Sequence, residues 1–257
     1  MINNKRVVVV MPAYNASLTL EKTYRELPFD IVDDVILVDD ASTDNTARLA
    51  NELGIVHSYM HDDNLGYGAN QKTCYRKALS LGGDIIIMVH PDYQYTPALV
   101  RSMASLIADN VFDCVLGSRI LGTGALKGRM PVYKYIGNRF LTFFQNILVG
   151  YKLSEYHTGY RAFSSKLLHS ISLEQNSDKF IFDNQMLLQI IAKGFSIGEV
   201  TCPTRYFAEA SSISGWPLMA YGFGVLRESI IYRLTRLGLI NSIYSASKTD
   251  NSPDVMG

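Results

Sequence analysis

The 257-residue sequence predicts an α/β fold with a mostly parallel sheet and helices on both faces. Two observations support this fold class. Short runs of apolar, often β-branched residues alternate with helical patterns through the first half of the chain. Several of these runs are apolar on both faces, which is typical of buried parallel strands. The expected strands are residues 7–11, 35–38, 55–59, 85–89 and 114–117.

Helical patterns lie between and after these runs. Leu20, Tyr24 and Leu27 recur at helical spacing, and a second helical pattern at residues 46–53 stops at Gly54, a good residue to follow a helix. In the second half, the patterns predict helices at 132–149, 182–193 and 217–240 and extended chain at 195–206. We expect one domain over residues 1–244 and a disordered polar tail at 245–257.

The composition argues against several classes of protein. The 24 basic and 24 acidic residues cancel, so we expect no nucleic-acid partner. Three widely spaced cysteines fit neither a zinc site nor a disulfide framework, which favours a cytoplasmic protein with reduced thiols. The sequence contains no apolar run of 18 residues and no signal peptide, so we expect no membrane-spanning segment.

One apolar run, residues 85–89, ends abruptly on His90-Pro91-Asp92. In open α/β sheets, ligands bind outside the carboxyl ends of the strands. A carboxylate beside an imidazole at such an end is placed to meet a metal ion or a substrate. The alternative is that Asp92 caps the helix expected to begin near Pro97.

A second acidic strand end follows residues 35–38, where Asp39 and Asp40 are adjacent. A carboxylate there can accept hydrogen bonds from the uracil imide or from N1 and N2 of guanine, whereas adenine lacks these donors. Helix capping is the alternative for Asp40, Ser42 and Asp44, and it is the interpretation that we favour for Asp44.

The positions of the glycines argue against one class of ligand, the dinucleotides. The first strand ends in MPAYNAS, without the G-x-G-x-x-G of dinucleotide-binding folds, which argues against an NAD-dependent enzyme. Gly66 and Gly68, in the stretch 62–72, would let the backbone pass close to a flat or phosphorylated ligand. A tight turn before a helix explains them equally well.

Five motifs in register carry a family resemblance: VVVVMPAYN, VILVDDASTDNT, NLGYGANQ, IIIMVHPDYQYTP and VLGSR. Their order and spacing resemble family-2 glycosyltransferases with a GT-A (Rossmann-like) fold, most of all the dolichyl-phosphate mannose synthase-like branch. HTGYRAF at 157–163 and PTRYFAEASS at 203–212 resemble later motifs of that branch. The resemblance implies a nucleotide-binding half at about 1–120 and an acceptor half at about 121–244.

The resemblance also implies contacts to a nucleotide-sugar donor. Two residues would flank the base, one or both neighbouring carboxylates would read its edge, and an arginine would face the phosphates. The expected donor-binding residues are Pro12, Tyr14, Asp39, Asp40, Gly68, Arg119 and Arg129.

A metal site is implied in the same way. Asp92 matches the second carboxylate of the family's D-x-D motif, Gln94 matches a nearby polar ligand, and His90 replaces the first carboxylate. We therefore expect Mn²⁺ or Mg²⁺ on Asp92, His90 and Gln94, with Mn²⁺ favoured because imidazole suits it better. The alternative for His90 is a hydrogen bond to backbone or ribose. Ala16 also departs from the family pattern, which has a carboxylate there.

For the catalytic groups, Asp183 in FIFDNQ is the first candidate and His157 the second. His157 stands where the resemblance leads us to expect an acid, and an unperturbed histidine pKa near 6.5 suits a base at neutral pH. Asp183 as a helix N-cap is the alternative. An acceptor that is already an anionic phosphate needs no base.

The resemblance implies transfer of a sugar from a nucleotide-sugar donor with inversion, and a carboxylate that reads the base fits a UDP- or GDP-linked donor. The segments 132–149 and 217–240 mix aromatic, aliphatic and basic residues, the composition of a helix at a membrane interface. The resembling branch glycosylates polyprenyl phosphates, so the resemblance implies such an acceptor, and we expect the protein to bind peripherally at the inner face of the membrane. Alternatives are core packing of these helices, a soluble sugar acceptor, a nucleotide-sugar binding protein without turnover, or a nucleotidyltransferase. The cations expected near the acceptor are Lys127, Arg129, Lys134 and Arg139.

Overall fold

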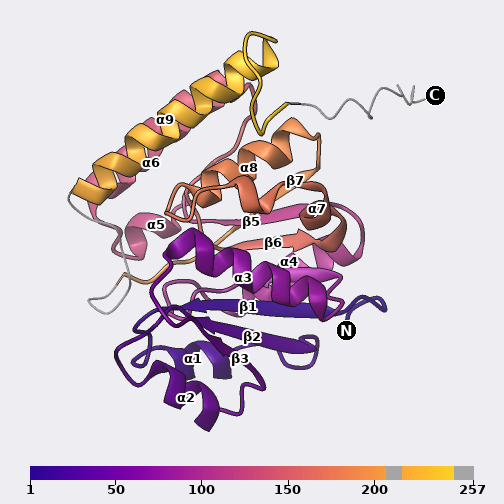
Figure 1. Ribbon diagram of the computed structural model, residues 1–257. Coiled ribbons are helices and arrows are strands. Elements are labelled where there is room, and N and C mark those ends of the chain that lie inside the picture. Colours follow the sequence, from indigo (N-terminus) through magenta and orange to yellow (C-terminus); the bar gives the residue numbers. More distant parts are fainter. Residues whose placement is uncertain (207–215, 246–257) are drawn as a thin grey trace.

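The computed structural model describes residues 1–206 and 216–245, and for Trp216 and Pro217 it describes the backbone only (Figure 1). All but the first residue of the expected tail lies outside these ranges. The same holds for the part of the PTRYFAEASS motif that follows Tyr206.

Seven strands form one sheet in the order β3-β2-β1-β4-β6-β5-β7. Strands β3, β2, β1 and β4 are mutually parallel, β6 is antiparallel to both of its neighbours, and β5 is parallel to β7. The predicted α/β fold with a mostly parallel sheet is therefore confirmed. The strands are β1 (Val7–Ala13), β2 (Asp34–Asp39), β3 (His57–Met60), β4 (Ile85–Met88), β5 (Cys114–Ser118), β6 (Arg161–Ser164) and β7 (Ile197–Thr201).

Helices cover both faces of this sheet, so the second part of the fold prediction is also confirmed (Figure 1). Side chains of β1 alternate between the two layers because successive residues of a strand point to opposite faces. One layer contains α1 (Leu20–Arg25), α2 (Thr46–Glu52) and α4 (Leu99–Ala108), and the other contains α3 (Tyr67–Ser80), α7 (Ser165–Ser170) and α8 (Phe182–Ala192).

Two long helices, α6 (Val132–Val149) and α9 (Trp216–Arg236), pack side by side beyond the sheet, and α9 also contacts α8 (Figure 1). The buried side of α6 is largely polar, and Gln145 donates to the hydroxyl of Ser229 on α9 at 3.2 Å. A short helix, α5 (Gly124–Lys127), and a 3₁₀ turn, η1 (Leu173–Gln175), complete the connections. None of the described helices combines the length and apolarity needed to cross a membrane.

The register gathers several chain segments at one edge of the sheet. Pairing of Ala13 with Asp39 and of Val10 with Met88 places the ends of β1, β2 and β4 together. Because β6 runs antiparallel to both β4 and β5, the segment that enters β6 lies at the same edge as the end of β5. This edge is where ligands bind in open α/β sheets.

The structure differs from the sequence predictions in two strands. β6 was not predicted, because it has only four residues, begins with the buried charge of Arg161 and runs directly into α7. β3 begins at His57, which pairs with Ile36, whereas Ile55 lies before the strand and packs into the core.

Candidate active site

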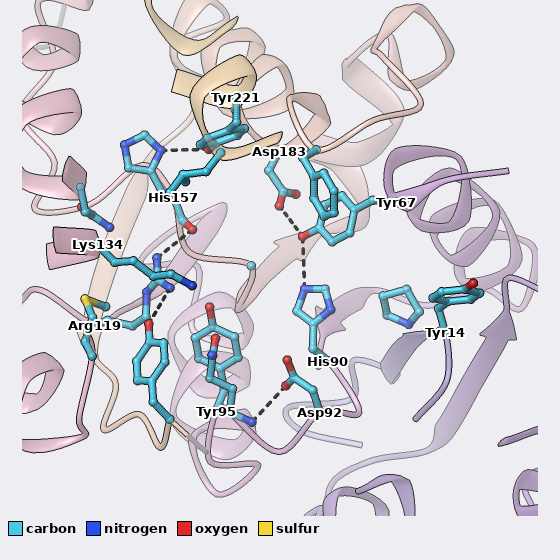
Figure 2. Close-up of a pocket in the computed structure, with 18 of the residues that line it drawn as sticks. Tyr14, Tyr67, His90, Asp92, Tyr95, Arg119, Lys134, His157, Asp183 and Tyr221 are labelled. Atoms are coloured by element: carbon cyan, nitrogen blue, oxygen red, sulfur yellow. Dashed lines mark hydrogen bonds between the residues drawn. The ribbon is translucent and has the colours of Figure 1, made fainter. Parts of the chain in front are cut away.

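A cavity of about 780 Å³ opens at the carboxyl edge of the sheet and is walled on its other side by α6, α8 and α9 (Figure 2). Most of the residues predicted from the sequence meet there, although they come from distant parts of the chain. The predicted residues that line it are Pro12, Tyr14, Asp40, His90, Asp92, Gln94, Arg119, His157 and Asp183.

Three predicted donor contacts lie outside this lining. Asp39 is buried, and one of its oxygens accepts from the backbone N–H of Ser42 at 2.9 Å. Arg129 is exposed just beyond α5. Gly68 N–H donates to the carbonyl of Asp178 at 2.8 Å, and a Cβ at this glycine would lie 2.4 Å from the carbonyl oxygen of Ser177. A close contact within the protein therefore explains this glycine.

Asp40 shapes the donor side of the cavity through its hydrogen bonds. Asp40 Oδ1 accepts from the backbone N–H of Leu65 at 3.0 Å, and Oδ2 accepts from the backbone N–H of Gly66 at 2.9 Å. His61 Nδ1 lies 2.8 Å from Oδ1. Gly66 has a φ of 98°, a backbone conformation that favours glycine. Asp40 thus holds the loop before α3 against the end of β2, next to the half-exposed ring of Tyr14.

Asp44 joins the loops after β1 and β2 at the rim of this region. Its carboxylate accepts from the backbone N–H groups of Thr46 at 2.9 Å and Ser17 at 3.0 Å. Burial opposes ionisation, but the hydrogen bonds from Thr46 and Ser17 outweigh it and hold the pKa of Asp44 at about 2. Asp44 is therefore ionised and contacts the first residue of α2, consistent with a structural role.

Asp92 lies in a turn after β4 and does not cap α4, whose N-cap is Ala98. Its Oδ1 accepts from the backbone N–H of Gln94 at 3.0 Å, and the intervening Tyr93 has a φ of 56°. Both Asp92 and Gln94 line the cavity.

The donor set tests whether a metal ion fits. Among the residues that the structure describes, no three His, Cys, Asp or Glu side chains come together as a cage. Mg²⁺ sites in phosphate-transferring enzymes use one or two carboxylates and complete the coordination with phosphate oxygens and water. The carboxylate of Asp92 on the cavity wall fits an ion of that kind, shared with a bound diphosphate.

Asp183 lies in the first turn of α8, whose N-cap is Ile181 without a side-chain cap bond, so N-capping does not account for this carboxylate. Tyr67 donates a hydrogen bond to Asp183 Oδ2 at 2.6 Å, and Tyr67 Oη lies 3.3 Å from His90 Nε2 (Figure 2). Asp183 Oδ1 is buried and has no hydrogen-bond partner within the described chain. The buried guanidinium of Arg161 donates to the Asp183 carbonyl at 2.7 Å and so fixes the start of α8.

A buried ion pair forms the opposite wall. Arg119 directs Nε toward Glu155 Oε1 at 2.8 Å, Nη2 also contacts this oxygen, and the backbone N–H of Arg119 donates to Oε2 at 2.8 Å. Asn138 of α6 donates to the same carboxylate at 2.7 Å. Burial alone would raise the pKa of Glu155, but the charge and hydrogen bonds of Arg119 lower it, so the pair is ionised.

His157 is a weak base in this setting. Burial is the main cause that lowers its pKa to about 4, and Arg119 and Arg161 lower it further while Glu155 opposes them. Its Nδ1 lies 2.9 Å from the hydroxyl of Tyr221 on α9. At neutral pH the imidazole is uncharged, and its low pKa makes it a poor proton acceptor.

Neither Glu155 nor Tyr67 was predicted from the sequence. The family resemblance implies an acid at position 157, whereas the acidic residue is Glu155, two residues earlier in SEYHTGYR and fully buried against Arg119. Tyr67 lies in the NLGYGANQ motif, in which only the two glycines were expected to contact a ligand. Lys134, expected only near an acceptor, lines the cavity, and burial and the neighbouring Arg119 lower its pKa (Figure 2).

We predict that Glu155→Gln lowers the free energy of unfolding by about 3 kcal/mol, because it leaves the buried Arg119 guanidinium without its counter-charge. Chemical denaturation of the purified variant measures this loss. Glu52→Gln, which removes the carboxylate of an exposed pair with Arg48, is the control and should lower it by less than about 0.5 kcal/mol. Equal small losses in both variants would show that the buried pair does not stabilise the fold.

Known proteins match this chain in sequence and in structure. The sequence model of glycosyl transferase family 2 matches residues 8–172. The UDP-N-acetylglucosamine–dolichyl-phosphate N-acetylglucosaminyltransferase of Methanococcus voltae is 30% identical over 250 residues, covering 91% of this chain and 96% of that relative. The undecaprenyl-phosphate mannosyltransferase of Micrococcus luteus is 28% identical over 242 residues, covering 91% of this chain and 94% of that relative.

Among solved structures, glucosyl-3-phosphoglycerate synthase from Mycobacterium tuberculosis, in complex with Mn²⁺ and UDP-glucose, shares the fold with a TM-score of 0.66. The identity is 20%, and the match covers 93% of this chain and 81% of that one. Together with the family match over residues 8–172, these likenesses show that the chain belongs to glycosyl transferase family 2 and is a glycosyltransferase with a GT-A fold.

Proposed function

We propose that this protein transfers a sugar from a UDP- or GDP-linked donor to a polyprenyl phosphate at a membrane surface, with inversion. The observation behind this proposal is that charged and apolar side chains line a single cavity. Its charged part includes Asp92, Arg119 and Lys134, and its apolar part includes Phe140, Leu141 and Leu218 from the two long helices. A phosphate attached to an isoprenoid chain has the same two chemical parts.

The donor would bind against the ends of β1, β2 and β4. Pro12 and Tyr14 would flank the base beside Asp40, and Asp92 with Gln94 would hold a divalent cation on the diphosphate. When bound, such an ion neutralises the leaving diphosphate and acts as a Lewis acid. A solved neighbour was crystallised with Mn²⁺ and UDP-glucose, which supports a divalent cation and a nucleotide-sugar donor.

The acceptor phosphate would bind on the opposite side, near Lys134 and Arg119. Glu155 already neutralises Arg119, so the side chain of Lys134 supplies the additional positive charge at this wall. A phosphate oxygen would attack the anomeric carbon as the bond to the donor diphosphate breaks. Asp183 would take the proton of an acceptor that arrives as the monoanion, through the oxygen that Tyr67 leaves unpaired.

The outer surface of α6 supports a membrane location. This helix has an inverted pattern: its buried side includes Asn138, Thr142 and Gln145, while its exposed side is apolar. Large apolar side chains normally pack in a core, but those on the outer side of α6 are 38–64% exposed when the described residues are considered. They are Val132, Tyr133, Ile136, Phe140, Phe143, Phe144 and Ile147, and Met219, Phe223 and Ile230 of α9 add to the exposed apolar surface.

Basic residues accompany this surface. Arg139 is exposed on α6 itself, and Lys127 and Arg129 are exposed beside α5. An apolar helix face flanked by cations is typical of proteins that bind the headgroup region of anionic membranes. The relatives named for dolichyl-phosphate and undecaprenyl-phosphate transfer support an acceptor that resides there.

Asp92→Asn should weaken the binding of Mn²⁺ together with UDP or GDP by about tenfold or more, because a neutral amide is a poorer ligand for the ion that the diphosphate shares. Titration calorimetry of each nucleotide with and without Mn²⁺ measures the loss. Asp109→Asn, the same chemical change at an exposed position outside the cavity, is the control. Unchanged metal-dependent affinity in Asp92→Asn would remove Asp92 from the metal site.

Replacing Ile136, Phe140 and Phe143 together by Ser should abolish co-sedimentation with vesicles that contain polyprenyl phosphate, since it removes the exposed apolar groups of α6. The matched control replaces Leu18, Val56 and Val111, which are also exposed but lie outside α6 and α9, by Ser. Neutral vesicles should bind little of any variant. Equal binding of both triple variants would show that this helix face does not contact lipid.

A further inference from the structure

Tyr67 lies between the two sides of the cavity. Neither the family match nor the proposed metal site gives this residue a role. It is the first residue of α3, and its hydroxyl lies between His90, after β4, and Asp183, on α8 (Figure 2). Its ring also packs against Phe180, with ring centroids 4.9 Å apart, and stacks on the His90 imidazole at 5.7 Å and 17°.

The hydrogen bonds of the Tyr67 hydroxyl determine which ring nitrogen of His90 carries a hydrogen. The Tyr67 hydroxyl has one proton and donates it to Asp183 Oδ2 at 2.6 Å. The same oxygen lies 3.3 Å from His90 Nε2, so it can only accept there. His90 Nε2 must then carry a hydrogen, so this nitrogen has no lone pair for a metal ion, and only Nδ1 of the ring could bind one.

A second, independent contact holds the imidazole in this place. A Cβ built on Gly159 would lie 2.4 Å from His90 Nε2 and 3.3 Å from the Tyr67 hydroxyl. The chain that enters β6 therefore passes directly against the ring, and a glycine is required where it does so. His90 occupies a niche between this backbone and Tyr67.

We propose that Tyr67 is a positioning residue that holds His90 through Nε2, which is thereby withheld from the metal, and orients Asp183 through Oδ2. Asp92 is the carboxylate after β4 that lines the cavity, and the second oxygen of Asp183 is buried without a hydrogen-bond partner in the described chain. The consequence for Asp183 rests on the proposed glycosyl transfer. The consequence for the His90 nitrogen depends only on the hydrogen bonds of the protein itself.

Imidazole ¹⁵N spectra of the protein without ligands test the first consequence. The chain has five histidines, and loss of one signal set in His90→Gln identifies the His90 resonances. We expect a hydrogen on His90 Nε2 in the wild type at neutral pH. A bare Nε2 would overturn the inference, whether or not the protein transfers a sugar, and this measurement does not depend on any variant of Tyr67 folding.

Tyr67→Phe tests the positioning role, with Tyr24→Phe on α1 as the control because that ring packs on Phe29 outside the cavity. Tyr67→Phe should lower kcat by about tenfold to a hundredfold, the range for misplaced catalytic groups, while the KM for the donor stays within about twofold. Mn²⁺–nucleotide affinity should stay the same in Tyr67→Phe, because the Tyr67 hydroxyl contacts His90 and Asp183 and is not expected to contact the ion. An unchanged kcat would overturn the inference.

Discussion

The ion pair between Arg119 and Glu155 connects the sheet to the helices that close the cavity. Arg119 follows β5, Glu155 lies in the segment that leads into β6, and Asn138 of α6 hydrogen-bonds the same carboxylate. Arg119 also donates to the carbonyl of His157 at 2.9 Å and to the hydroxyl of Tyr206 at 3.1 Å. A buried pair of this kind is strongly destabilising when only one partner is removed. The wall of the cavity that Arg119 and α6 form therefore depends on this ion pair for its position.

The ion pair explains how one cavity can be lined by charged side chains in one part and by apolar side chains in another. Asn138 of α6 donates to the ion pair and Gln145 donates to α9, so the helix packs with its polar side inward. Its aromatic side then faces outward, and Phe140 both lines the cavity and is exposed on the surface. A lipid phosphate entering from a membrane would reach Lys134 along this helix.

Local patterns in the sequence predict the fold and the location of the site well. Apolar runs marked the parallel strands, and the polar residues that end them, such as Asp40, Asp92 and Arg119, do line one cavity because carboxyl ends of parallel strands share an edge. Contacts between distant residues could not be predicted. Tyr67 hydrogen-bonds Asp183, which is 116 residues away in the sequence. Gly68 packs against the backbone near Asp178, and residues close to Gly68 in the sequence do not predict this contact. Domain limits and the role of each site residue stay predictions.

In the proposed reaction, the charged and apolar side chains of one cavity bind a single lipid-phosphate acceptor. The most direct test supplies radiolabelled UDP- and GDP-sugars with Mn²⁺ to the protein, together with vesicles that contain or lack polyprenyl phosphate. We predict label in the lipid extract only when polyprenyl phosphate is present, and with a donor of one base preferred. Label transferred to a soluble sugar in the same mixture, with none in the lipid extract, would contradict this account.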